Sequence, residues 1–163
     1  MMRVLLSGLI MWAALAPLAP ASAAGTIDAL PQRVQTGLWD LQRACNWVGG
    51  RPGDATQAIE SADLDGDGTP DLILDEARFP CRDVEPGAAC PKIGCSTYVT
   101  LSDHGRWRPA LDYVGGYCLE PASKPPKLLT IQKNYSVDGG LSVLHVRYVF
   151  KRGMAFQEGR GKC

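Results

Sequence analysis

The sequence predicts an α+β domain that is mainly antiparallel β. One N-terminal helix is expected to pack beside a meander sheet of about six or seven strands, stabilised by disulfides. Three observations lead to this prediction: a helical repeat of apolar residues that occurs once, alternating patterns in the second half of the chain, and six cysteines among 163 residues. At roughly 100–200 residues per domain, this length allows one domain.

The helical repeat ends at about residue 48. Its apolar residues recur at steps of four and three: Leu30, Val34, Leu38 and Leu41. This spacing predicts one buried helix face, flanked by Trp39 and Cys45. Gly37 lowers the helix propensity by about 1 kcal/mol relative to alanine. The segment 49–54, rich in glycine and proline, predicts a loop.

The second half of the chain alternates apolar and polar residues, which is typical of half-buried strands. The expected strands cover residues 96–101, 106–111, 128–133, 141–152 and 154–157. The first two flank the turn 102–105 and form a hairpin. Segments 79–94 and 121–126 are expected to be loops, the first one held by cysteines.

Residues 1–23 have the composition of an export signal. Arg3 precedes an apolar run over 4–16, and 21–23 reads Ala-Ser-Ala, which matches the order of a secretory signal peptide and its cleavage site. Two prolines and a serine end the run below the roughly 20 apolar residues that span a membrane. The sequence therefore predicts a signal peptide at 1–23, a mature domain at 24–163, and a periplasmic or secreted location.

The charge balance removes one class of partner. Lysine and arginine number 17, as do aspartate and glutamate, and the pI is about 6.7. Nucleic-acid binding normally needs a clustered basic footprint, so no nucleic-acid partner is expected. No second apolar run approaches the membrane-spanning length, so no membrane insertion is expected either.

The cysteine count favours disulfides, because exported domains fold where thiols are not kept reduced. The six residues are Cys45, Cys81, Cys90, Cys95, Cys118 and Cys163. They allow 15 pairings, and the sequence does not choose among them. The spacing contains no Cys-x-x-Cys, which argues against a zinc ribbon. Three bridges, two bridges with a free thiol pair, and an intermolecular link through Cys163 all stay open.

One segment carries recognisable chemistry, the run Asp-Leu-Asp-Gly-Asp-Gly-Thr-Pro-Asp at 63–71. Its carboxylates Asp63, Asp65, Asp67 and Asp71 occupy loop positions 1, 3, 5 and 9, with Gly68 at position 6. Calcium prefers six to eight oxygen ligands, and the carbonyl of Thr69 would supply one more. Position 12 is Leu74 rather than glutamate, so the loop is not an EF-hand.

The segment 62–74 resembles the calcium loop of FG-GAP and VCBS-type repeats, as in integrin α-subunit propellers. The resemblance implies a loop between two antiparallel strands, with Asp63, Asp65, Asp67 and Asp71 as side-chain ligands and Thr69 as a carbonyl ligand. The motif occurs once, so the loop is carried over and the propeller is not. The strand–loop–strand pattern also resembles small exported bacterial proteins. The alternative is a plain hairpin turn made of aspartate and glycine.

Other candidate sites are weaker, and no catalytic residue is predicted. His104 and His145 are the only histidines, and neither stands in a hydrolase motif. Acidic residues that could pair for glycosidase chemistry are Glu60, Asp75, Glu76 and Asp83. Aromatic residues could line a carbohydrate or peptide groove, but most are expected in the core; they include Trp39, Trp47, Trp107, Tyr98, Tyr113, Tyr117 and Tyr148.

These observations favour one function and leave two others open. The favoured function is a non-enzymatic exported domain that holds a structural Ca²⁺ and binds a protein or a cell-envelope component. The first alternative is a small secreted inhibitor of a lytic enzyme or protease. The second is a small hydrolase with His104 and the loop 79–94 near its catalytic centre.

Overall fold

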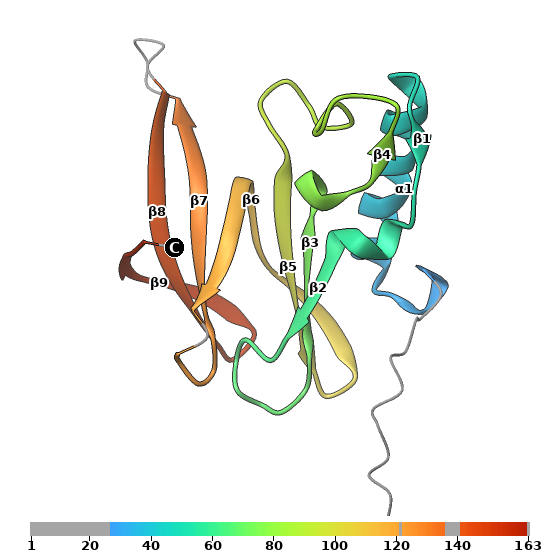
Figure 1. Ribbon diagram of the computed structural model, residues 1–163. Coiled ribbons are helices and arrows are strands. Elements are labelled where there is room, and N and C mark those ends of the chain that lie inside the picture. Colours follow the sequence, from blue (N-terminus) through green and yellow to red (C-terminus); the bar gives the residue numbers. More distant parts are fainter. Residues whose placement is uncertain (1–26, 121, 136–140, 163) are drawn as a thin grey trace, which may run out of the picture.

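The computed structural model describes residues 27–120, 122–135 and 141–162, and these form three layers (Figure 1). The α-helix of this described part of the chain, α1 (Gln32–Trp47), covers one face of strands β2, β3 and β5. Strands β7, β8 and β9 lie on the opposite face, and β6 crosses from one group of strands to the other. The elements are η1(Ile27–Ala29), α1(Gln32–Trp47), β1(Arg51–Pro52), η2(Ala55–Ala58), β2(Ile59–Ala62), β3(Asp71–Asp75), η3(Glu76–Arg78), β4(Cys81–Arg82), β5(Ser96–Asp103), β6(Arg106–Glu120), β7(Lys127–Tyr135), β8(Leu141–Lys151) and β9(Met154–Arg160).

The prediction of a mainly antiparallel fold with one helix is confirmed. Over the residues that the structure describes, the main sheet has seven antiparallel strands in the order β2-β3-β5-β6-β7-β8-β9, which is a meander except that β4 leaves it. Strand β4 pairs with β1 in a separate two-stranded sheet. The predicted strands all exist, but the second strand of the first hairpin runs to Glu120 rather than to residue 111. The short strands β1 and β4 were not predicted.

Helix α1 forms where the apolar repeat predicts it, and its buried residues are Val34, Leu38, Leu41 and Cys45. They pack against Leu72 and Leu74 of β3. Leu30, predicted on the same face, lies just before the helix and packs against its edge. A Cβ atom at Gly37 would lie 2.7 Å from Cδ2 of Leu74, so the glycine lets the helix approach the sheet. The residue that weakens the helix therefore permits its packing.

Strand β3 is buried at all five positions because both of its faces are covered. Leu72 and Leu74 face α1, whereas Ile73 joins Val99 and Leu101 in a core beneath β7 and β8. This second core includes Leu128 and Phe150, which are 0% and 2% exposed. The antiparallel sheet thus forms the middle and the far layer of the same fold.

Strand β6 changes partners in the middle of its length. Its residues up to Val114 pair with β5, and from Gly115 onward they pair with β7. Gly115 has a φ of 138°, and a Cβ atom there would lie 2.0 Å from the carbonyl oxygen of Ile131. A strand that switches sheets in this way forms the corner of a two-layer packing. Gly115 is the residue that permits the corner.

Two disulfides fasten the segments around the helix. Cys45 at the end of α1 is bonded to Cys81 of β4, with 5.7 Å between Cα atoms. Cys90 is bonded to Cys95, with 4.9 Å between Cα atoms. Cys118 of β6 is also disulfide-bonded, and Cys163 lies outside the described residues. The prediction of a disulfide-stabilised fold is confirmed for these residues.

Candidate metal centre

The candidate metal loop connects β2 to β3, which pair in antiparallel register with Ala62 opposite Asp71. The loop lies at the end of the molecule where the β5–β6 turn also lies (Figure 1). Gly66 and Gly68 have φ values of 82° and 86°, a left-handed backbone that favours glycine. The strand–loop–strand arrangement expected from the sequence is therefore present.

Three of the predicted ligands converge. One carboxylate oxygen from each of Asp63, Asp65 and Asp71 lies within 4.8 Å of the other two. Asp71 is fully buried, and the other two are half-buried. Like charges at this separation oppose one another unless a proton or a cation compensates them. The cluster offers oxygen donors alone, which suits a hard divalent cation.

Asp71 holds the loop to the sheet. Its Oδ2 accepts a hydrogen bond from the backbone N–H of Leu64 at 2.8 Å, and its Oδ1 accepts one from Ser102 of β5 at 2.8 Å. Burial raises the pKa of the Asp71 carboxyl, and these two hydrogen bonds oppose that rise. A carboxylate has about four lone-pair sites, so two N–H contacts leave acceptor capacity for a cation.

The other loop carboxylates also shape the turn. Asp63 accepts hydrogen bonds from the backbone N–H groups of Gly66 and Gly68 at 2.8 and 3.0 Å. Asp65 accepts one from Asp67 at 3.2 Å. Burial raises the pKa of the Asp65 carboxyl, and the charges of neighbouring aspartates raise it further. The loop therefore holds its carboxylates close together against their mutual repulsion, and a bound cation would offset that repulsion.

Asp67 and Thr69 are outside this cluster of three. Asp67 accepts a hydrogen bond from the backbone N–H of Thr69 at 2.7 Å. Their roles as ligands stay predictions. Between the clustered acids, Leu64 is 1% exposed and packs into the core beneath β7 and β8. The alternation of acid and leucine at 63–65 thus directs the acids to one side and the leucine to the core.

A pocket of about 510 Å³ lies beside the loop. Asp65, Gly66 and Asp67 line one side, and residues at the ends of the β5–β6 and β8–β9 hairpins line the rest: Asp103, His104, Arg108, Arg152 and Gly153. Arg108 pairs with Asp103 at 2.7 Å, while Nε2 of His104 is 4.0 Å from Oδ1 of Asp103. The His104 side chain is 95% exposed. It is not held in the hydrogen-bonded geometry that a general base uses.

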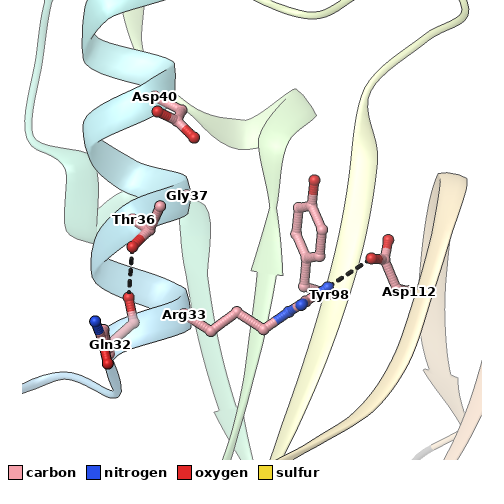
Figure 2. Close-up of a pocket in the computed structure, with 7 residues that line it drawn as sticks. All are labelled: Gln32, Arg33, Thr36, Gly37, Asp40, Tyr98 and Asp112. Atoms are coloured by element: carbon pink, nitrogen blue, oxygen red, sulfur yellow. Dashed lines mark hydrogen bonds and ion pairs between the residues drawn. The ribbon is translucent and has the colours of Figure 1, made fainter.

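A second pocket lies between α1 and the β5–β6 hairpin (Figure 2). Arg33 of α1 reaches across it to Asp112 of β6 at 2.6 Å. The guanidinium also lies over the ring of Tyr98, 5.3 Å from its centroid. Both charges are satisfied within the pocket, so its residues connect the helix to the hairpin. The sequence gives no signal for this long-range pairing.

The tryptophans correct the prediction that most aromatic residues belong to the core. Trp39, Trp47 and Trp107 are 46%, 91% and 40% exposed. Trp39 and Trp47 do not share the face of α1 that carries Leu38 and Cys45. The four tyrosines named above are half-buried. Helical periodicity, applied to the tryptophans themselves, would have placed Trp39 and Trp47 toward solvent.

The predicted acidic residues at the other end of β3 form a polar network instead of an open pair. Glu60 accepts hydrogen bonds from the hydroxyl of Tyr117 and from Arg78, both at 2.7 Å. Asp75 is 7% exposed and accepts a hydrogen bond from the backbone N–H of Ala77 at 2.9 Å. Asp83 instead pairs with Arg51. The contacts of Glu60 join β2 to η3 and to β6.

Replacing Asp75 with asparagine is expected to change how stability depends on pH. Burial raises the pKa of Asp75, and Glu60 adds to that rise, while Ala77 and Arg78 oppose it. A carboxyl whose pKa is raised in the folded state stabilises the protein fully at pH values below 3.8, its pKa in the unfolded chain. This stabilisation is lost as the pH rises through the folded-state pKa. Urea unfolding should therefore show Asp75→Asn gaining stability over the wild type from pH 3.8 toward neutrality. A pH-independent difference would contradict this.

Among the described residues, no helix is long and apolar enough to cross a membrane. Comparison of the chain with protein-family models, with curated proteins and with solved structures gives no match in any of the three, so the candidate metal centre depends on its own sequence and geometry.

Proposed function

We propose that this chain is an exported calcium-binding domain in which the ion is structural, and that the domain binds a protein or a cell-envelope component without turning over a substrate. The observation that carries the proposal is the convergence of Asp63, Asp65 and Asp71, one of them fully buried, in a loop with calcium-type spacing.

The donor set supports calcium among the divalent cations. The cluster contains carboxylates and no histidine or cysteine, which are the donors that zinc and copper prefer. Calcium accepts irregular shells of six to eight oxygens, whereas magnesium demands a near-ideal octahedron. Asp67 and the Thr69 carbonyl would complete the shell, as the resemblance to FG-GAP and VCBS-type loops implies.

The surroundings of the cluster support a structural role. Asp71 accepts a hydrogen bond from the backbone N–H of Ser102 in β5, and Leu64 packs in the core. A cation bound to Asp71 would therefore fasten the loop to the middle layer of the fold. Export is supported by the signal-like segment 1–23, which lies outside the described residues, and by disulfides that persist in oxidising compartments.

Calorimetric titration with calcium tests the proposal. One ion per chain is expected to bind the wild-type protein, and Asp65→Ala should abolish measurable binding at millimolar calcium because it removes a clustered carboxylate. Asp28→Ala is the matched control, since Asp28 is an exposed aspartate outside the cluster. Absence of binding to the wild type, or equal binding to Asp65→Ala, would reject the metal centre.

A further inference from the structure

A small disulfide-closed loop projects from the fold between β4 and β5. Its sequence is Cys90-Pro91-Lys92-Ile93-Gly94-Cys95, and the disulfide joins its two ends. The backbone N–H of Gly94 donates to the carbonyl oxygen of Pro91 at 2.9 Å, which places Lys92 and Ile93 at the apex of a turn. Pro91 and Lys92 are exposed, and Ile93 is 58% exposed. A lysine and a large apolar side chain thus stand together on a constrained tip.

The base of this tip is fixed on both sides. Ala89 is buried in the core under α1. The carbonyl oxygen of Cys95 accepts a hydrogen bond from Gly115 at 2.9 Å, and the N–H of Ser96 donates to Glu76 at 2.7 Å. Loops held by a rigid scaffold are frequent sites of recognition, because little conformational entropy is lost when they bind.

The tip carries one positive charge, at Lys92, which an acidic group of a partner could recognise. No described ion pair of this chain involves Lys92, so its ammonium is available to a carboxylate on another molecule. A convex loop with a lysine at its apex fits a concave cleft that has an acidic residue at its base. Serine proteases of trypsin-like specificity have such a cleft, in which the S1 pocket receives lysine or arginine.

We propose that the Cys90–Cys95 loop inserts into the active-site cleft of a trypsin-like serine protease, with Lys92 in the S1 pocket, and that the chain inhibits that enzyme. The loop and the metal loop lie at opposite ends of the molecule (Figure 1). The inference therefore goes beyond the proposed calcium site and does not depend on it.

The disulfide favours inhibition over simple cleavage. Addition of one water to the Lys92–Ile93 peptide bond would give a carboxylate at Lys92 and an ammonium group at Ile93. The Cys90–Cys95 bond would still join the two pieces, so they would stay in the cleft, where loss of the same water can re-form the peptide. Ring closure also limits the shapes available to the free loop.

Inhibition assays with trypsin and a small lysine substrate test this. The purified chain with intact disulfides should inhibit with one-to-one stoichiometry, and Lys92→Ala should weaken inhibition by about 30-fold or more, as expected for a charged hot-spot residue. Lys92→Arg should inhibit as the wild type does, because the same pocket accepts arginine. Lys162→Ala, which removes an exposed lysine outside the loop, should also be unchanged.

Lys92→Leu gives a second and independent test. Chymotrypsin has an apolar S1 pocket, so this variant should lose inhibition of trypsin and gain inhibition of chymotrypsin. Matching thermal unfolding curves would show that each variant is folded. The proposal is overturned by an excess of wild-type chain that leaves trypsin active, by equal inhibition from Lys92→Ala, or by rapid cleavage at Lys92–Ile93 without inhibition.

Discussion

Replacing Gly115 with alanine is expected to destabilise the protein by about 3–5 kcal/mol, combining backbone strain with overpacking. The φ of 138° is unfavourable for any residue with a Cβ atom, and that atom would lie 2.0 Å from the carbonyl oxygen of Ile131. Strand β6 passes from β5 to β7 at this residue, so relief of the clash would disturb the pairing of two layers. Urea unfolding monitored by tryptophan fluorescence measures the loss.

Gly116→Ala is the matched control. It is the next residue in the same strand, its φ is not in the left-handed region, and a Cβ atom there would meet no atom within 4 Å. Its effect should be small, about 1 kcal/mol or less. Equal losses from the two variants would mean that glycine is needed at the corner for a reason other than the close approach at Gly115.

Calcium is expected to raise the melting temperature of the wild-type protein. At a free concentration 100 times its dissociation constant, a ligand that binds only the native state adds about 2.7 kcal/mol. For a chain of this size that corresponds to a rise of roughly 5–10 °C. Melting curves in EDTA and in excess calcium measure the shift.

Asp65→Ala should remove the calcium-dependent shift, because it takes one carboxylate from the cluster. Without calcium, the same variant should melt no lower than the wild type does in EDTA, since it relieves repulsion from Asp63 and Asp67 that raises the pKa of Asp65. Asp28→Ala should keep the full calcium response. A wild-type melting temperature that is the same in EDTA and calcium would reduce the loop to a hairpin turn.

The sequence predicts most of the fold because the helix and the longer strands each have a distinct local period. Val34, Leu38 and Leu41 recur as on a helix face, and their burial confirms this. The extent of β6 could not be predicted, since two consecutive glycines at 115–116 look like the end of a strand. Only the carbonyl of Ile131, which comes from another strand, reveals that Gly115 permits a change of partner.

The candidate metal centre was also predictable only in part. Asp63, Asp65 and Asp71 are close in sequence, so their spacing alone predicts that they converge. The hydrogen bond from Ser102 to Asp71 joins residues 31 positions apart and has no local signal. Disulfide pairing also could not be read from the sequence: Cys45 and Cys81 are 36 positions apart, while Cys90 and Cys95 are five apart.

The aspartates at the two ends of β3 influence the register in which this strand pairs with its neighbours. This fully buried strand begins with Asp71 and ends with Asp75, on the same face as Ile73. A slip of one residue would turn both carboxylates toward the apolar core under α1 and would take Asp71 away from its Ser102 donor on β5. A misaligned sheet would therefore bury two acids in apolar surroundings, with Asp71 lacking that partner. Burial of Asp71 and Asp75 costs free energy in the native state, but it costs more in the shifted registers. The two aspartates therefore favour the native register.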